Sequence, residues 1–364
     1  MVLGWRRRSP PQLQCPCIMP TVKIDQPLRV VLAGFGDFGQ VHAGAWRRYG
    51  SAVLLTIAEP DATRRQRAAT SHADAEIVAD PLPALAQADA IDIVTPADTH
   101  AELAIAALAA GCDVLVEKPF VLTAADAHRV ATAAAKSDRL IQLGYFFRAH
   151  PLAQALRARL RAAEPAIWID ADFTSLKRPR RDAGVIDNDA VHFLDLVCWL
   201  VGRYPSEVTA LIRHPLGRSF EDIALITLAW DDGLVARVQA SCVLAGPLPD
   251  PVVPGGWSRK AITVTTRREQ FTADFMTDTL RERAARLESA ADGSWRTAVD
   301  TAQERSVAAA GTEEVVAAEI GAFLSAIRSR GPTLADLESG VRMVEICDAV
   351  HRSARAGRTV RLGS

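Results

Sequence analysis

Residues 30–40 of the chain read VVLAGFGDFGQ, an apolar run followed by Gly34-x-Gly36-x-x-Gly39. The apolar run is typical of a buried strand, and the residues that follow, Gln40 to Tyr49, predict a helix. In this order the first glycine permits a tight turn, the second lets the backbone approach a pyrophosphate, and the third lets helix and strand pack closely. The free N–H groups at the start of the helix favour a bound phosphate. The stretch therefore predicts the phosphate-binding turn of a dinucleotide-binding fold.

The expected cofactor site extends beyond the three glycines. The next predicted strand, Val53 to Ala58, ends in Glu59, which can accept hydrogen bonds from the adenosine ribose hydroxyls. Because a carboxylate there repels a 2′-phosphate, we expect NAD, although Arg64 and Arg65 soften the repulsion and leave NADP open. The other residues of the turn that we expect beside the cofactor are Phe35, Asp37 and Phe38. The alternative is a glycine-rich turn that binds no ligand.

Composition limits the classes of protein that fit. The 364 residues suffice for two or three domains, and 49% of them are hydrophobic. The net charge of −1 argues against a general nucleic-acid binder, and no apolar run approaches the ~20 residues that span a bilayer. Four of the six cysteines sit singly in apolar segments, and Cys15-Pro-Cys17 is too short a pattern for a zinc site. We therefore expect no metal, no nucleic-acid or membrane partner, and a cytoplasmic location.

Residues 1–26 contain Arg6-Arg7-Arg8 and two adjacent prolines without a periodic apolar face. The arginines resemble a twin-arginine export signal, but no sustained apolar segment follows them. We expect a disordered extension or a start codon placed too far upstream.

Two architectures follow one another along the chain. From residue 27 to 147, predicted strands alternate with predicted helices, which indicates a Rossmann-type α/β domain with a doubly wound parallel sheet. From 148 to 364, strand-like runs joined by tight turns, such as DDG at 231–233, predict an α+β domain with a large, mostly antiparallel open sheet. Residues 245–257 are predicted to form a Pro/Gly-rich loop, and the polar residues 277–311 have no clear pattern. Two amphipathic helices close the chain, at 313–329 and 336–356.

A series of motifs now identifies a family resemblance. The motifs are the glycine turn, Thr95-Pro96 with His100, Glu117-Lys118-Pro119, Gly144-Tyr145 with Arg148 and Pro151, and His192-x-x-Asp195. From about residue 28 to the end, the series resembles the glucose–fructose oxidoreductase / inositol dehydrogenase / rhizopine catabolism (GFO/IDH/MocA) family. The resemblance implies a two-domain NAD(P)-dependent enzyme that acts on a hydroxyl or ketone of a sugar, polyol or sugar nucleotide. It also implies a homodimer or homotetramer formed through the second sheet. Cofactor contacts are implied for Thr95, Pro96, His100, Glu117 and Lys118.

Lys118 is the first candidate for the proton transfer that accompanies hydride transfer. It follows a predicted strand, and ligands of open α/β sheets bind at the carboxyl ends of strands. A lysine that is partly desolvated beside an oxidised nicotinamide would have its pKa lowered into the useful range. Glu117 could orient it. The alternative is a surface lysine at a strand end, and the resemblance favours the catalytic role.

His192 is the second candidate, on a predicted helix at Asp189 to Val201. Lone helical histidines are more often packed than catalytic. Asp187, Asp189 and Asp195 surround it in sequence, and neighbouring carboxylates would hold the imidazole proton more firmly. We therefore expect His192 to act on the substrate.

One position departs from the family. Its usual pattern is Asp-x-Gly-x-His, whereas this chain has Asn188 and Ala190 before His192. An amide can orient a hydroxyl but cannot accept a proton as a carboxylate does. Either Asp187 or Asp189 substitutes for it, or Lys118 and His192 act alone.

Further substrate contacts are expected from a basic loop, which reads KRPRR at 177–181. Lys177 and Arg178 could bind a carboxylate or phosphate of a sugar acid, phosphosugar or nucleotide-linked sugar, although most of such a charge run is usually solvated. Tyr145 and Arg148 could line the cleft between the domains.

Three functions remain open from the sequence. The first is a dehydrogenase or reductase of a sugar-like alcohol or ketone. The second is a dinucleotide-binding regulator without catalysis, against which the presence of Lys118 and His192 argues. The third is an oxidoreductase of the same fold that acts on a non-sugar such as a pyrrole, imine or dihydrodiol.

Overall fold

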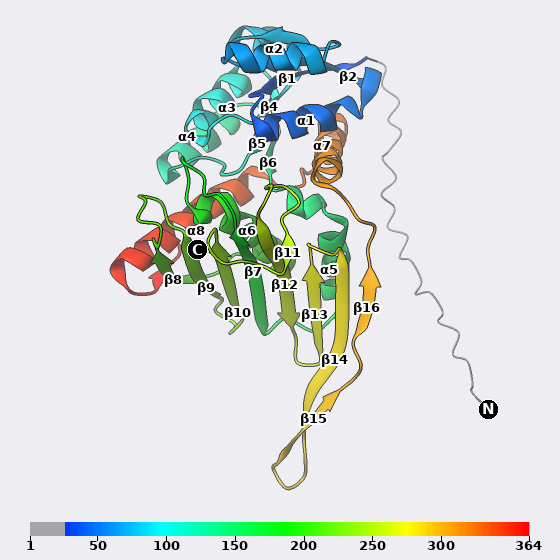
Figure 1. Ribbon diagram of the computed structural model, residues 1–364, viewed down its shortest axis with the longest axis vertical. Coiled ribbons are helices and arrows are strands. Elements are labelled where there is room, and N and C mark those ends of the chain that lie inside the picture. The colour runs from blue at the N-terminus through cyan, green and yellow to red at the C-terminus, as the bar shows by residue number, and fades with distance from the viewer. Residues whose placement is uncertain (1–25, 364) are drawn as a thin grey trace, which may run out of the picture.

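The computed structural model describes residues 26–363, in which two sheets lie one above the other (Figure 1). The expected N-terminal extension, apart from its last residue, and Cys15-Pro-Cys17 lie outside the described residues. The first sheet is fully parallel with the order β3-β2-β1-β4-β5-β6, which confirms the doubly wound Rossmann topology. Its strands are β1 (Leu28–Ala33), β2 (Val53–Ala58), β3 (Glu76–Val78), β4 (Ala90–Ile93), β5 (Asp113–Glu117) and β6 (Ile141–Gly144).

Helices connect these strands largely where the sequence predicts them. The hydroxyl of Thr123 accepts a hydrogen bond from the Asp126 N–H at 3.1 Å and so caps the helix that begins at Ala124. The first helix, however, begins at Asp37 and not at Gln40, because Gly36 is extended and the acid at Asp37 suits the first turn. The helical segments of this part are α1 (Asp37–Arg47), η1 (Gly50–Ala52), α2 (Ala62–Ser71), η2 (Leu82–Gln87), η3 (Ala97–Thr99), α3 (His100–Ala109), α4 (Ala124–Ala134) and η4 (Phe146–Ala149).

The second sheet has eleven strands in the order β15-β14-β13-β12-β7-β10-β9-β8-β17, with β11 beside β12 and β16 beside β14. All neighbours are antiparallel except β7 and β10, which confirms the expected mostly antiparallel sheet. Its first strands are β7 (Trp168–Leu176), β8 (Glu207–Arg213), β9 (Ile223–Ala229), β10 (Val235–Ser241), β11 (Leu248–Pro249) and β12 (Trp257–Thr265). The later ones are β13 (Glu269–Asp274), β14 (Thr279–Ser289), β15 (Trp295–Val299), β16 (Gln303–Ser306) and β17 (Val360–Arg361).

The segment 277–311, which had no clear pattern, forms three of these strands. The β14–β15 hairpin extends beyond the body of the domain (Figure 1), and Leu287 and Trp295 on it are exposed. Without a buried face, a strand has no reason to alternate polar and apolar residues, so its period-2 signal is missing. The loop expected at 245–257 is also interrupted, because it contains β11.

Helices cover one face of the second sheet and join it to the first. α5 (Pro151–Ala162), α6 (Val191–Val201) and α8 (Leu337–Ala356) contact its strands. α7 (Thr312–Ser329) packs against α1, and α8 contacts both β6 and β8. Because α8 touches both sheets and α7 packs on the first part of the chain, the expected division at residues 147 and 148 remains a prediction. Among the helices between residues 26 and 363, none is long and apolar enough to cross a membrane.

Candidate functional site

The glycine turn joins β1 to α1 at the carboxyl edge of the first sheet. Gly34 has φ +99°, and a Cβ there would lie 2.6 Å from the Val94 carbonyl oxygen. A Cβ on Gly39 would collide with the Gly34 carbonyl group, so both positions require glycine. A Cβ on Gly36 would meet nothing within 4 Å, which leaves open space above the first turn of α1. This cradle fits the pyrophosphate of a dinucleotide.

Glu59 lies where the sequence predicts it, directly after β2, and its carboxylate is almost fully buried. One oxygen accepts the Phe35 N–H at 2.8 Å, and the other accepts the Asp61 N–H at 2.9 Å and the Arg64 guanidinium at 2.8 Å. Burial opposes ionisation, but the hydrogen bond from Arg64 and the two N–H groups outweigh it and lower the pKa of Glu59. The carboxylate is therefore charged and fixed beside the glycine turn.

Thr95, Pro96 and His100 hold neighbouring loops of the same edge together. The ring of His100 is buried and bonds three backbone carbonyls, those of Thr95 at 2.9 Å, Pro119 at 3.0 Å and Phe120 at 3.1 Å. Its contacts thus join the loop after β4 to the loop after β5. The structure gives His100 a positioning role between these loops, and contact with a cofactor remains a prediction.

Lys118 follows β5 at the same carboxyl edge and points towards the second part of the chain. Its ammonium donates to the backbone carbonyl of Asn188 at 2.9 Å. Desolvation lowers the pKa of Lys118, against the attraction of Glu117 and Asp189. The predicted direction of this shift is confirmed. Glu117 accepts the backbone N–H of Lys118 at 3.0 Å, so it fixes the strand end and not the ammonium.

A buried polar network lies directly behind Glu117. His42 contacts Asp92 at 2.8 Å through Nδ1 and Glu117 at 3.3 Å through Nε2, and the Trp46 indole donates to Asp92 at 2.7 Å. Desolvation opposes protonation of His42, but the two carboxylates prevail and raise its pKa well above the ordinary value. Glu319 of α7 is also buried, and burial raises its pKa well above the ordinary value. The network holds Glu117 at the end of β5 in place. The sequence did not predict it, because its members are far apart along the chain.

The helix expected from Asp189 begins instead with a π-helical turn, η5 (Ile186–Ala190), before α6. Such turns recur at functional sites because they re-aim side chains. The amide of Asn188 donates to Asp189 Oδ1 at 2.9 Å, and the same oxygen accepts the Lys177 ammonium at 2.6 Å. Asp189 is therefore a carboxylate of this turn that is held in place by two donors and attracts the Lys118 ammonium. Burial raises the pKa of Asp187, against the opposing charges of His351 and Lys118.

His192 is buried in an aromatic cage. Its ring stacks on Phe173 at 5.8 Å between centroids and meets Phe146 and Phe147 edge-on at 5.1 and 5.4 Å. Desolvation lowers the pKa of His192 well below its ordinary value, and the charges of three lysines, at positions 118, 260 and 177, lower it further. The expectation that carboxylates hold its proton was wrong, because Asp195 pairs with Arg148 and the charges that act on His192 are those of the lysines. His192 is a neutral imidazole.

Two residues that we expected in the cleft are engaged in the core. Arg148 forms a two-pronged pair with Asp195, at 2.9 and 2.6 Å, and donates to the Leu334 carbonyl at 3.1 Å. Tyr145 is buried, and desolvation raises its pKa well above the ordinary value. Arg178 of the basic loop is exposed, so Lys177 is the member of that loop that the structure brings to Asp189.

Lys260 is a further member of the site that sequence reasoning missed. It lies on β12 with 8% of its surface exposed, and its ammonium contacts Asp250 at 3.1 Å. Lys260 has the same alternation phase as the buried Ile262 and Val264. A lone charge on the apolar face of a strand was the available signal.

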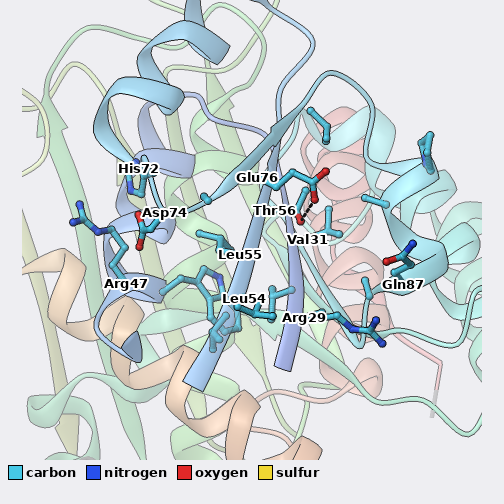
Figure 2. Close-up of a pocket in the computed structure, with 18 of the residues that line it drawn as sticks. Arg29, Val31, Arg47, Leu54, Leu55, Thr56, His72, Asp74, Glu76 and Gln87 are labelled. Atoms are coloured by element: carbon cyan, nitrogen blue, oxygen red, sulfur yellow. Dashed lines mark hydrogen bonds between the residues drawn. The ribbon is translucent and has the colours of Figure 1, made fainter. Parts of the chain in front are cut away.

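A hollow of about 740 Å³ lies elsewhere, at the amino-terminal ends of the first-sheet strands (Figure 2). Arg29 of β1, Leu54 of β2 and Glu76 of β3 line it, together with Arg47 of α1. Because the sheet is parallel, this end is opposite to the edge that carries Lys118. The hollow mixes apolar side chains with charges of both signs and contains none of the expected site residues.

Comparisons with known proteins agree with this geometry. Residues 28–145 match the GFO/IDH/MocA model described as an oxidoreductase family with an NAD-binding Rossmann fold. Residues 176–362 match the model of that family's C-terminal alpha/beta domain.

Individual relatives cover most of the chain. The UDP-N-acetylglucosamine 3-dehydrogenase of Acidithiobacillus ferrooxidans is 29% identical over 87% of this chain and 94% of its own length. The D-apiose dehydrogenase of Paraburkholderia graminis is 27% identical over 92% of this chain and 89% of its own. A levoglucosan dehydrogenase solved in complex with NADH is 20% identical with a TM-score of 0.78, over 93% of this chain and 100% of that one. At that identity, the last similarity shows the fold alone.

Proposed function

Because the chain belongs to the GFO/IDH/MocA family of NAD(P)-dependent oxidoreductases, we propose that Lys118 exchanges the proton while a hydride moves between NAD(H) and a secondary alcohol or ketone of a sugar-like substrate. The observation that carries the proposal is the position of Lys118. Its ammonium projects from the carboxyl edge of the Rossmann sheet to the π-turn of the second part of the chain, and its pKa is lowered by desolvation. The sugar-like class is supported by relatives named as dehydrogenases of UDP-N-acetylglucosamine, inositol and apiose.

The residues of the chain divide the work as follows. When bound, the nicotinamide accepts the hydride from the carbon or returns it. The neutral form of Lys118, made accessible by its lowered pKa, takes the hydroxyl proton in the oxidation direction and returns it in reduction. His192 is neutral, so it can accept or donate a hydrogen bond at the substrate oxygen. Asp189 accepts hydrogen bonds from Lys177 and from the Asn188 amide, and so fixes these two side chains beside the proposed substrate site.

The proposed cofactor is NAD. The cradle above Gly36 would hold the pyrophosphate, and Glu59 would accept the adenosine ribose hydroxyls. The carboxylate stays charged because Arg64 and two backbone N–H groups stabilise it, so a 2′-phosphate would meet a fixed negative charge. Arg64 pairs with this carboxylate at 2.8 Å and offsets part of its charge, which weakens the discrimination against a 2′-phosphate.

We also propose a homodimer or homotetramer that forms through the open face of the second sheet. Trp168 and Leu176 at the ends of β7, and Trp257 on β12, are exposed large apolar residues of this face. Between them, Asp172 pairs with Arg237 and Arg259 at 3.0 Å each. Light scattering on the purified protein tests this: a monomer at micromolar concentration would contradict it.

Replacing Lys118 with alanine tests the proposed function. We expect turnover, followed by nicotinamide absorbance, to fall roughly 100- to 10,000-fold, which is the usual contribution of general acid–base catalysis. NADH affinity should change little, because the glycine turn and Glu59 remain intact. Turnover close to that of the unmodified protein would remove Lys118 from the mechanism.

A further inference from the structure

Two lysines flank the aromatic ring on which His192 stacks. Lys177 lies directly after β7 and Lys260 on the neighbouring strand β12, and both ammonium groups approach the Phe173 ring, at 5.6 and 5.2 Å from its centroid. His192 stacks on the same ring with an interplanar angle of 15°. The two cations are therefore fixed on a common support beside the proposed reaction centre.

Both ammonium groups keep unused hydrogen-bond donors. Their side chains are only 9% and 10% exposed, and each makes one polar contact among residues 26–363, with Asp189 for Lys177 and with Asp250 for Lys260. An ammonium has three N–H donors, so two on each lysine remain available. Leaving buried donors unpaired costs free energy unless a ligand accepts from them.

The two carboxylates accept from other donors as well. Asp189 accepts the Asn188 amide and the Lys177 ammonium through the same oxygen, and its second oxygen, Oδ2, has no hydrogen-bond partner among residues 26–363. Asp250 accepts a further set of donors besides Lys260, namely the Ser258 hydroxyl and the N–H groups of Val252 and Val253. Each acid is thus part of the frame and does not occupy the remaining lysine donors.

The charges that act on the His192 ring are positive. They are the ammonium groups of three lysines, at positions 118, 177 and 260, although Glu117, Asp189 and Asp250 each attract one of these lysines. The ammonium groups disfavour a proton on His192, so an added negative charge would be attracted to this position.

We infer that the substrate carries a carboxylate, which Lys177 and Lys260 bind beside His192. The inference rests on the proposed function and narrows its substrate class to sugar acids or similar hydroxy acids. A carboxylate has two oxygens that can accept from two separate ammonium groups, and such charge-assisted hydrogen bonds are the stronger kind. A neutral polyol could accept hydrogen bonds from the two ammonium groups but would not balance their positive charge.

The experiment compares matched ligands on the NADH complex by thermal shift and calorimetry. The carboxylates are D-gluconate, D-galacturonate and L-tartrate, and their neutral partners are D-glucitol, D-galactose and L-threitol, with D-glucose 6-phosphate as a phosphate ester. We expect at least one carboxylate to bind roughly 10- to 100-fold more tightly than its partner. Equal affinity within every pair, no carboxylate binding at 50 mM, or tighter binding of the phosphate ester would each overturn the inference.

Substitutions then assign the preference to the lysines. Lys260→Met should abolish it, and Lys260→Arg should restore most of it, since the charge returns. Arg259→Met is the matched control, because Arg259 is the neighbouring residue of β12 but points to the exposed face and pairs with Asp172. If Lys260→Met unfolds, Lys177→Met provides the same test. Carboxylate preference that survives in both lysine variants would refute the assignment.

The failures of the two proposals are distinguishable. Rapid oxidation of a neutral polyol that depends on Lys118 would leave the proposed function intact and would overturn the inference that the substrate carries a carboxylate. Carboxylate binding to the NADH complex without any hydride transfer would leave the anion site intact and count against the proposed function.

Discussion

The buried pair of Arg148 and Asp195 gives a sharp test of which predicted site residues belong to the core. Both side chains are nearly inaccessible, at 7% and 1%, and two hydrogen bonds of 2.9 and 2.6 Å join them. Arg148→Met removes the cation and leaves the buried carboxylate of Asp195 without its partner. Breaking one side of a buried pair costs about 3–5 kcal/mol, and the lost bond to the Leu334 carbonyl adds about 1 kcal/mol.

The double variant Arg148→Met, Asp195→Leu separates pairing from packing. It removes both charges and replaces them with apolar side chains, so its cost should be well below the sum of the two single variants. Urea unfolding measures these costs, with NADH affinity as the control that should not change. Additive losses would show that the two residues do not act as a pair.

The defect of Arg148→Met should also depend on pH. Burial already raises the pKa of Asp195 although Arg148 opposes the shift, and without the arginine it should rise further. A group with a raised folded pKa binds its proton more tightly in the folded protein, so its contribution to stability is present at low pH and is lost as pH rises. The variant should therefore be less defective at pH 5 than at pH 8. A loss below about 1 kcal/mol at pH 8, accompanied by weaker substrate binding, would refute the structural role and return Arg148 to the substrate site.

Three further predictions concern single residues. Burial lowers the pKa of His150 to about 4, so between about pH 6.5 and pH 4 the unfolded chain binds a proton that the folded protein does not. The free energy of unfolding should therefore fall as pH decreases through this range, by up to about 1.4 kcal/mol per pH unit. His150→Asn keeps an acceptor for the Leu152 N–H and should flatten this pH dependence, as measured by urea unfolding. Gly144→Ala would place its Cβ 2.5 Å from Glu117 Oε1, so we expect a loss of about 1–3 kcal/mol in stability together with slower turnover, and an unchanged variant would show that the strand end can shift. Glu59→Ser should weaken NADH binding and reduce discrimination against NADPH, and calorimetry with both cofactors would contradict this if the ratio stayed the same.

The sequence predicts the Rossmann part well because its signals are local. The strand, the glycines and the helix of residues 30–40 are contiguous, and so are Thr123 and Asp126 at the start of α4. A strand buried on both faces also reads as an apolar run. β1 and β2 could therefore be placed close to their observed bounds.

The site could be predicted only where its members carry their own motif. Lys118 follows a predicted strand in the short signature Glu-Lys-Pro, so its place at the carboxyl edge of the sheet could be predicted without knowledge of distant residues. The position of Lys260 beside the Phe173 ring and the His42 network depend on contacts across dozens of residues, for which periodicity carries no information. The β14–β15 hairpin shows the same limit, since a strand exposed on both faces has no binary pattern.

The reversal at His192 shows why neighbours in sequence are poor guides to a titration. Asp195 lies on the same helix as His192, but it faces Arg148 in the core. Lys260 comes from a strand that is distant in sequence, yet its charge reaches the imidazole across the Phe173 ring. Since the free energy of a charge depends on burial and on distance in space, burial lowers the pKa of His192 and the lysines lower it further. A neutral imidazole beside these ammonium groups is therefore a site that favours a hydrogen-bonding, negatively charged ligand.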